Sequence, residues 1–502
     1  MREATRQGYV SLPALAATIT AGHPPKSPSL PDPWAEPMTE TDTTFRTSTY
    51  IKLTVMMILQ FFIWGAWLPL IFGYLPQLGF SSQVPPKPFD TLFPESVAWF
   101  FSEQSLILNA FPFAAIVGLF FSNQFADRNF AAQKFLGFSH LVGGLAILSL
   151  GWVTDFWPFF LLMLLHCLLY VPTISISNSI AFAHMSDAKK EFGRVRMGGT
   201  VGWILAAWPF VFIMVDWDAV RAKNPTGMVE WLGTALGTPL VGDALKQSTR
   251  WTYVVSGVAS LLLAAFSLVL PHTPPKIVEV SGEGGRERLA WLEALKLLRH
   301  PYLMILWIVT LIDAFVHNCY FNWTGVYLQS DVVAIPGNWV TPVMSIGQIA
   351  EIVTMLVLGA VLTKFGWKLT MIVGVLGHAA RFAVYAYFPQ YPWLIVLIQV
   401  VHGICYAFFF ATVYIFVDEY LPHDARASAQ GLFNVMILGV GALLANAICP
   451  HLLQDVYVQD KVVDYHGLFM IPMGLSVGAA ILLAVFFWPP AKPNEKPIEA
   501  GH

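Results

Sequence analysis

The chain has 502 residues, of which 56% are hydrophobic and only 12% are charged, and its formal net charge is −3. Soluble domains usually carry about a quarter charged residues, so this composition excludes an ordinary soluble protein and predicts an integral membrane protein. The four cysteines all fall within apolar runs, where we expect small buried residues and neither a disulfide framework nor a zinc site. No metal and no other cofactor is predicted.

Residues 1–48 form a segment rich in Pro, Ser and Thr, for example "GHPPKSPSLPDPWAEP". Such a segment cannot bury enough apolar surface to fold, so we expect a disordered N-terminal tail. Two alternatives concern its beginning. The stretch "YVSLPALAATITAG" resembles a weak signal-peptide core, and translation could instead start at Met38.

Twelve apolar runs follow the tail, and each is long enough to cross a hydrocarbon core of about 30 Å as a helix. Six lie in an N-terminal half, 49–271, and six in a C-terminal half, 301–488, before a C-terminal tail at 489–502. The predicted fold class is therefore an all-α membrane protein with twelve transmembrane helices. The predicted spans are 51–75, 99–122, 134–153, 157–183, 196–216, 251–271, 302–328, 341–363, 367–388, 391–418, 427–449 and 466–488.

Residues 272–300 join the two halves. This linker begins with the breaker-rich stretch "PHTPPKIVEVSGEGG" and ends in "RERLAWLEALKLLRH", which has the pattern of a short amphipathic helix. Most Lys and Arg residues lie in this linker and in the other loops on the same side, as positive residues do on the cytoplasmic side of a membrane. We therefore expect a multi-pass protein of the cytoplasmic (inner) membrane with both termini and the linker inside.

Two six-helix halves joined by a cytoplasmic linker resemble the layout of the major facilitator superfamily, whose substrate site lies near mid-membrane between the halves. The loop "FADR" at 125–128, which contains Asp127 and Arg128, resembles the cytoplasmic loop signature of that superfamily. "TKFGWK" at 363–368 occupies the equivalent place in the second half. The chain has no G-x-x-x-x-G-K-[ST] loop for ATP and no H-E-x-x-H or G-x-S-x-G motif, so we do not expect an enzyme.

Four predicted helices each carry one polar face. A charge at mid-bilayer costs about 2.5–3.5 kcal/mol or more, so such groups must face a cavity or a partner. One alternative is that these polar residues only form hydrogen bonds between helices. However, Arg196 and Glu351 are opposite charges from opposite halves, as a central cavity for a polar solute requires. The faces are Arg196, Thr200 and Trp203; Asp313, His317, Tyr320 and Thr324; Gln348 and Glu351; and Gln399, His402 and Tyr406.

Three further polar residues in the spans have less definite roles. Arg381 lies in "HAARFAVYAYF" near His378, where a structural pairing, a snorkelling stem and a role in transport are all open. His140 and His166 are interpreted as hydrogen-bonded core histidines.

Several segments together resemble the nucleoside permease family of the major facilitator superfamily, the nucleoside:proton symporters. The resemblance covers nearly the whole transmembrane region and leaves out the N-terminal tail, the 76–98 loop and the 217–250 insert. It implies a secondary transporter that moves nucleosides by alternating access, with protons as co-substrate. The segments are "LQFFIWGAWL" at 59–68, "VPTISISNSIAF" at 171–182, "RMGGTVGW" at 196–203, "MSIGQIAE" at 344–351 and "ARASAQGLF" at 425–433.

The resemblance also implies which residues bind the nucleoside. Carboxylate and carboxamide groups can accept hydrogen bonds from ribose hydroxyls, and aromatic rings can stack on a base. From the first half the implied residues are Arg196, Thr200 and Trp203. From the second half they are His317, Tyr320, Gln348, Glu351, His402 and Tyr406.

Two departures from the family pattern bear on base preference and on proton coupling. His317 and Tyr320 stand where Gln and Asn are expected, which changes the hydrogen bonds offered to the base. Ala407 stands where an acidic residue is expected before the paired phenylalanines. Asp313 with His317, one helical turn apart, could share a proton instead, and Glu351 is a further candidate.

Alternatives to proton symport remain at this point. They are an uncoupled facilitator, a transporter of a sugar or another polar metabolite, and, in another class, a membrane sensor that binds a ligand without moving it. The partners expected from the sequence are a nucleoside, protons and the lipid bilayer. We expect no nucleic-acid partner, and a monomer.

Overall fold

The computed structural model describes residues 40–121, 130–185, 188–275, 296, 298–421 and 423–489. The chain divides into two units, Met1–Arg46 and Thr47–His502, and the architecture below concerns the second. The first helix begins at Glu40, within the predicted tail. The remainder of that tail, the "FADR" loop with Asp127 and Arg128, and most of the linker lie outside the described residues.

The N-terminal half consists of helices, because its apolar runs can satisfy their backbone hydrogen bonds only within each segment when no water is present. The elements are α1 (Glu40–Gln77), α2 (Glu95–Ala98), η1 (Trp99–Phe101), α3 (Glu103–Leu108), α4 (Ala110–Phe121), α6 (Ala132–Ser149), η3 (Leu150–Trp152), α7 (Phe156–Ala183), α8 (Ala188–Ala207), α9 (Phe210–Ile213), α10 (Trp217–Ala222), α11 (Met228–Leu236), α12 (Gly242–Thr249), α13 (Trp251–Phe266) and η4 (Ser267–Val269).

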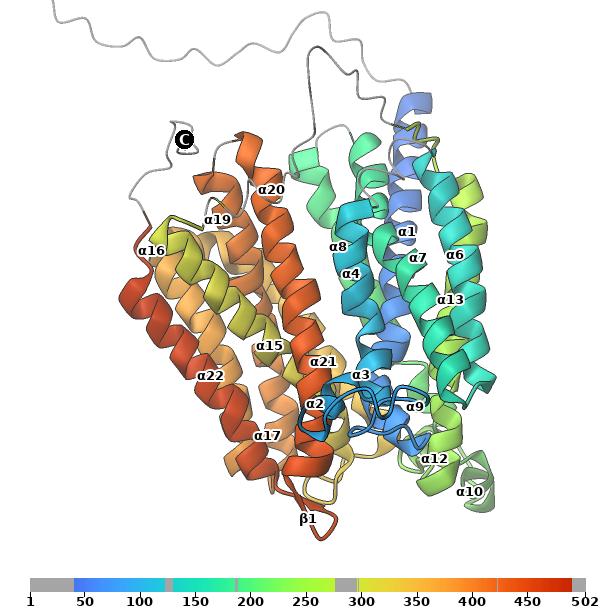
Figure 1. The fold of residues 1–502 in the computed structure, drawn as a ribbon. Coiled ribbons are helices and arrows are strands. Elements are labelled where there is room, and N and C mark those ends of the chain that lie inside the picture. Colours follow the sequence, from blue (N-terminus) through green and yellow to red (C-terminus); the bar gives the residue numbers. More distant parts are fainter. Residues whose placement is uncertain are drawn as a thin grey trace, which may run out of the picture. The chain divides into compact units, whose positions relative to one another are not determined.

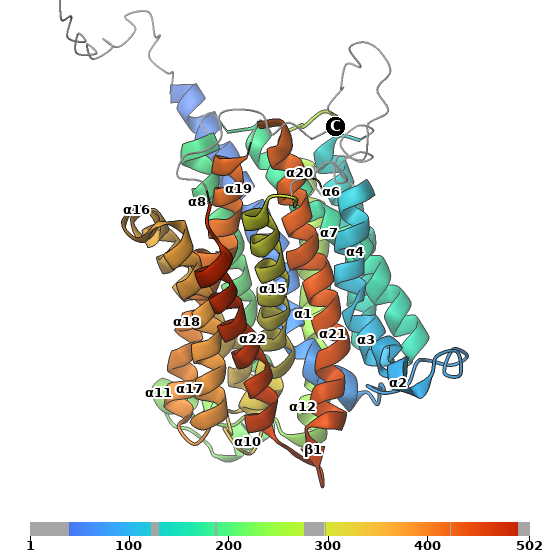
Figure 2. The same ribbon diagram turned by 60° about the vertical axis from the view of Figure 1, so that its left-hand side comes forward.

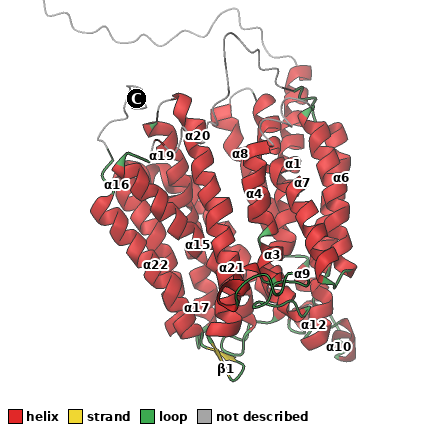
Figure 3. Ribbon diagram, in the orientation of Figure 1, coloured by secondary structure: helices red, strands yellow, loops and turns green. Residues whose placement is uncertain are grey.

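The C-terminal half is also helical, apart from one short hairpin in which β1 pairs antiparallel with β2 (Figure 3). Three π-helical turns, η7, η8 and η9, interrupt its long helices. The elements are α15 (Pro301–Gln329), η5 (Gly337–Trp339), α16 (Val340–Tyr387), α17 (Pro392–Leu397), η6 (Ile398–Val400), α18 (Val401–Cys405), η7 (Tyr406–Ala411), α19 (Thr412–Tyr420), α20 (His423–Asn434), η8 (Val435–Val440), α21 (Gly441–His451), η9 (Leu452–Val456), β1 (Val458–Gln459), β2 (Val462–Val463) and α22 (Tyr465–Phe486).

The number of membrane spans is consistent with the prediction of twelve. Within the described residues, 10 helices are long and apolar enough to cross a membrane, or up to 11 if the bent pair Glu95–Leu108 and Ala110–Gly118 forms one span. The helix α16 counts once, although it changes direction at Gly366, where φ is 71° and ψ is 174°. A positive φ suits glycine, so Gly366 separates the predicted spans 341–363 and 367–388.

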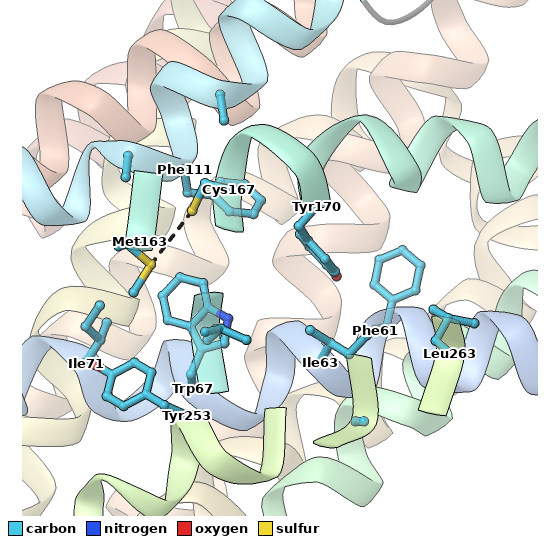
Figure 4. Packing of buried hydrophobic residues seen from close by; sticks show 14 of the residues in the cluster. Phe61, Ile63, Trp67, Ile71, Phe111, Met163, Cys167, Tyr170, Tyr253 and Leu263 are labelled. Carbon is cyan, nitrogen blue, oxygen red and sulfur yellow. Dashed lines mark hydrogen bonds between the residues drawn. The ribbon is translucent and has the colours of Figure 1, made fainter. Parts of the chain in front are cut away.

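The two halves form two helical bundles that lie side by side (Figures 1 and 2). The N-terminal bundle has its own apolar core, part of which is shown in Figure 4, where Phe61 and Tyr170 lie near each other. One core of the C-terminal bundle contains Phe409 and Phe416. A third apolar cluster joins both halves, because Phe210 of the first half packs in it with residues of the second.

Hydrogen bonds also join the halves, and they lie near the loops predicted to be outside. The side-chain amides of Gln104 and Gln454 donate a hydrogen bond to each other, with lengths of 3.0 and 2.8 Å. Thr341 Oγ1 donates to the carbonyl of Ala207 at 3.0 Å, and the Trp339 indole donates to the carbonyl of Leu236, also at 3.0 Å. The last bond ties the 217–250 insert, which contains α10, α11 and α12, to the second half.

Candidate functional site

A cavity of about 600 Å³ lies between the two halves. The N-terminal half lines it with residues of α1, α3, α4, α7 and α8. The C-terminal half lines it with residues of α15, α16 and the helices from α18 to α21. It extends from Trp67 and Leu108 to Phe182 and Gln430, which lie next to the loops predicted to be cytoplasmic. Contacts between the halves and the cavity therefore lie toward opposite sides of the predicted membrane.

Most of the residues that the sequence predicted for the site line this cavity. One does not: Tyr320 is fully buried behind the wall, where its ring lies 4.0 Å from the guanidinium carbon of Arg381 and its hydroxyl donates to Gln399 at 3.1 Å. Tyr320 is therefore not among the residues that line the cavity, and its predicted role in binding stays a prediction. The predicted residues that do line the cavity are Arg196, Thr200, Trp203, His317, Gln348, Glu351, His402 and Tyr406.

The two charged residues of the cavity come from opposite halves and are not paired with each other. Arg196 on α8 and Glu351 on α16 both line it, and among the described residues neither takes part in an ion pair within 4.0 Å. The guanidinium of Arg196 instead lies 4.0 Å above the ring of Phe61. Two partly exposed charges of opposite sign thus face one cavity without neutralising each other directly.

Close helix packing in the N-terminal half sets the position of Arg196. A Cβ atom on Gly199 would lie 2.5 Å from Nη1 of Arg196 and 2.6 Å from the ring of Phe61. Only a glycine at this point leaves room for the guanidinium to fold back onto that ring. One turn further along, Thr200 and Trp203 continue the same face of α8 into the cavity.

Aromatic rings from both halves form one wall of the cavity. Trp64 stacks on Phe111 with ring centroids 4.5 Å apart, and its edge meets Trp203 at 5.2 Å. Trp203 in turn contacts Phe321 of the second half at 6.3 Å. Such a wall can stack against a flat, aromatic solute.

The second half brings its polar groups together by a close approach of α16 to α18. A Cβ atom on Gly347 of α16 would lie 2.8 Å from Cβ of His402 on α18. A Cβ atom on Gly403 of α18 would lie 2.4 Å from backbone atoms of α16. Thr354 also donates to the carbonyl of Gly403 at 2.9 Å. The side chains of Gln348, Glu351 and His402 therefore reach the same cavity, and Oε1 of Gln348 has no hydrogen-bond partner there.

A group of buried polar residues lies directly behind His402. Arg381, which is fully buried, donates one bond to His402 Nδ1 at 3.1 Å and one to His378 Nδ1 at 2.7 Å. On its other side, Nε2 of His378 lies 3.8 Å from a carboxylate oxygen of Asp313. Of the readings open for Arg381, snorkelling is thus wrong, since the whole side chain is buried inside the protein.

The cavity also contains amide side chains that the sequence analysis did not single out, namely Asn178, Asn318, Gln430, Asn434 and Asn446. The sequence contains a pattern that could have identified Asn178. Ile174, Asn178 and Phe182 are spaced four residues apart and so share one helix face, and all three line the cavity. Asn446 donates to the carbonyl of Leu108 at 2.9 Å and accepts a bond from Asn322, so it also holds the two halves together.

In the part of the chain that the structure describes, no three His, Cys, Asp or Glu residues are placed to hold a metal ion. The four cysteines are buried and free. The chemistry available in the cavity is therefore hydrogen bonding, charge and stacking.

Comparison with known proteins gives a consistent result. The chain matches the family described as nucleoside H+ symporter over residues 47–229 and 216–492. It is 28% identical to YegT of Escherichia coli (strain K12) over 441 residues, which is 87% of this chain and 92% of YegT. It is 27% identical to the xanthosine permease of the same organism over 475 residues, which is 91% of this chain and 99% of the permease.

The crystal structure of the nucleoside transporter NupG has the same fold. It superimposes with a TM-score of 0.68 at 22% identity, over 88% of this chain and 100% of that one. The shared fold supports the predicted fold class, an all-α membrane protein.

Proposed function

The chain belongs to the nucleoside H+ symporter family and is a membrane transporter, not an enzyme, and we propose that the cavity between its halves binds the nucleoside. One observation carries this proposal above the others. Arg196 and Glu351, which come from different halves, face the same cavity and are not paired with each other. Buried charges usually pair, so two partly buried ones left apart favour a polar solute between them.

The chemistry of a nucleoside fits the groups present. The carboxylate of Glu351 and the free carbonyl oxygen of Gln348 can accept bonds from the two ribose hydroxyls. Arg196 and Thr200 can donate to the base or the sugar from the other half. Trp203 offers a ring on which the base can stack. The cavity volume lies within the usual range of about 300–1,000 Å³ for sites that bind small molecules.

The distribution of contacts between the halves supports an alternating-access cycle. The halves are joined near the predicted outer loops, while the cavity extends toward the predicted cytoplasmic side. We infer that this is an inward-facing state, and that the bonds from Gln104 to Gln454 and from Thr341 to Ala207 break when the halves rock outward. One chain contains the whole cavity, so we propose that the transporting unit is a monomer within the lipid bilayer.

The substitution Glu351→Gln tests the site. It replaces a charge-assisted acceptor with a neutral amide, so we expect the affinity for the transported nucleoside to fall at least tenfold, about 1.4 kcal/mol. Radiolabelled nucleosides and sugars, taken up by proteoliposomes with and without a pH gradient, would identify the substrate and measure this loss. Glu230→Gln, in the exposed helix α11, is the matched control and should leave affinity unchanged.

Two outcomes would contradict the proposal. If Glu351→Gln folds and binds every transported nucleoside as tightly as the wild type, Glu351 is only a contact between helices. If a sugar is accumulated and no nucleoside is, the cavity has another substrate.

The orientation of the chain in the cytoplasmic membrane is also a proposal. We expect Ser281→Cys, in the linker, to be protected from an impermeant thiol reagent added to intact cells. Ser96→Cys, which is exposed at the predicted outer side, should react. The natural cysteines are buried and give a silent background. Labelling of Ser281→Cys together with protection of Ser96→Cys would show that the chain has the opposite orientation.

A further inference from the structure

Behind the wall of the cavity, four side chains of the second half form a buried group, which we call the Arg381 cluster. Its members are at most 2% exposed. They come from three helices that are distant in sequence, so the fold and not local sequence brings them together. The Arg381 cluster consists of Asp313 on α15, His378 and Arg381 on α16, and His402 on α18.

Arg381 determines which nitrogens of the two histidines carry protons. A guanidinium group only donates hydrogen bonds, so the Nδ1 atoms of His378 and His402 that it contacts must act as acceptors. The neutral rings then carry their protons on Nε2. The Nε2–H of His378 lies 3.8 Å from Oδ2 of Asp313. The carboxylate and the guanidinium are thus linked through one imidazole ring.

Asp313 is poorly bonded for a buried carboxylate. Neither of its oxygens has a hydrogen-bond partner, and the distance to His378 is too long for a hydrogen bond. Buried carboxylates that serve only to hold helices together are normally fully hydrogen-bonded, because an unbonded charge in the membrane interior is costly. This one has room to gain a proton without breaking an existing hydrogen bond.

The charge of the Arg381 cluster depends on Asp313 alone if the histidines stay neutral. The further titratable groups near the Arg381 cluster are His317 and Tyr320 on α15, Tyr385 on α16 and Cys405 on α18. Arginine remains charged in proteins and cannot pass a proton on. The cluster is therefore neutral when Asp313 is ionised and carries one positive charge when Asp313 is protonated.

Two histidines connect the Arg381 cluster to the cavity. His402 belongs to the cluster and also lines the cavity. His317 is not a member of the cluster, but it lines the cavity too and lies one helical turn from Asp313. The ring of His317 stacks on that of His402 at 5.0 Å and lies 5.7 Å from that of His378, and its Nδ1 has no partner. A proton from solvent in the cavity can thus approach Asp313 by way of His317.

We propose that Asp313 carries the proton that is transported with the nucleoside, with Arg381 as its fixed counter-charge. This proposal rests on the proposed function. A proton from the cavity solvent binds one carboxylate oxygen of Asp313 and forms a neutral carboxylic acid, and the same O–H bond breaks when the proton leaves to solvent on the other side. His402 contacts Arg381 and faces the substrate space, so a change of charge at Asp313 can act on the nucleoside site through Arg381 and His402. Coupling requires such an interaction between the two sites.

The test uses the full-length protein in proteoliposomes and compares two assays. Nucleoside counterflow measures exchange without a proton gradient, and uptake against an inward proton gradient measures coupled accumulation. We expect Asp313→Asn to lower gradient-driven accumulation at least tenfold while counterflow stays within about twofold of the wild type. Asp331→Asn, in the exposed turn that follows the same helix, should behave as the wild type in both assays.

A second variant protects the test against misfolding. Asp313→Asn leaves Arg381 buried without its counter-charge, whereas the double variant Asp313→Asn with Arg381→Gln removes both charges together. We expect the double variant to retain counterflow and to lose accumulation. Normal accumulation in either variant would overturn the proposal and leave nucleoside transport intact. A wild type that exchanges nucleosides but never accumulates them would also overturn it, whereas no nucleoside exchange at all would refute the proposed function itself.

Discussion

Each half of the transporter contains a buried polar network beside the cavity, and the two networks differ in kind. In the N-terminal half, Gln60 donates to Thr173 at 2.8 Å and is bonded to His140 at 3.0 Å. His140 is bonded in turn to Ser260, also at 3.0 Å. None of the four residues carries a fixed charge, and each of their side-chain nitrogens and oxygens has a hydrogen-bond partner. The Arg381 cluster of the C-terminal half is charged, and several of its atoms have none.

This difference separates polar groups that hold helices together from polar groups that can change state. A neutral network with every partner in place gains nothing from a proton and stabilises a single packing. A buried carboxylate without hydrogen bonds beside a fixed guanidinium can gain or lose a proton, and its charge then alters the surroundings. We therefore propose that the N-terminal bundle serves as a scaffold for Arg196, while the C-terminal bundle contains the groups suited to coupling.

The largest expected effect comes from removing Arg381 alone. Arg381→Met leaves the Asp313 carboxylate buried without a counter-charge and removes the donors to both histidines. Breaking a buried charge pair in this way typically costs about 3–5 kcal/mol. We expect a loss of this size in the free energy of unfolding, measured by equilibrium unfolding in mixed detergent micelles. Adding Asp313→Asn to the variant should recover much of it.

Arg221→Met provides the control for this prediction. Arg221 forms an exposed ion pair with Asp218 on α10, and exposed pairs contribute about 0–1 kcal/mol. If Arg381→Met were as mild as Arg221→Met, Arg381 would carry no buried charge interaction. The contrast between the two halves would then lose its basis.

Much of the fold could be predicted from the sequence, because a membrane span needs only a long apolar run and a helix. The two apolar runs on either side of Gly366 were likewise predicted as separate spans, and the structure changes direction between them. The bend of 75° between the pair Glu95–Leu108 and Ala110–Gly118 was not predicted. Hydropathy does not encode where a helix changes direction, and the predicted span 99–122 was treated as one helix.

The candidate site was predictable up to the direction of each side chain. Helical spacing places Arg196, Thr200 and Trp203 on one face, and the structure puts all three on the cavity. Tyr320 was predicted on the same face as His317 but lies behind the cavity wall, because a periodicity tells which residues share a face and not how deep each one lies. The pairing of Arg381 with His378, three residues away on the same helix, was one of the readings open from the sequence. The contact with His402 was beyond the sequence, since His402 lies on another helix, 21 residues away.

The smaller expected effect concerns the neutral network of the N-terminal half. Gln60→Met removes the bonds to Thr173 and His140 but changes no charge, and Gln60 is buried and not among the residues that line the cavity. Hydrogen bonds between membrane helices are worth about 0.6 kcal/mol on average, so losing two should lower the free energy of unfolding by about 1–2 kcal/mol. Nucleoside affinity and the ratio of gradient-driven accumulation to counterflow should stay as in the wild type, because no group that binds substrate or proton is altered. If that ratio fell as it is expected to fall in Asp313→Asn, the N-terminal network would take part in coupling, and the division of roles between the halves would be wrong.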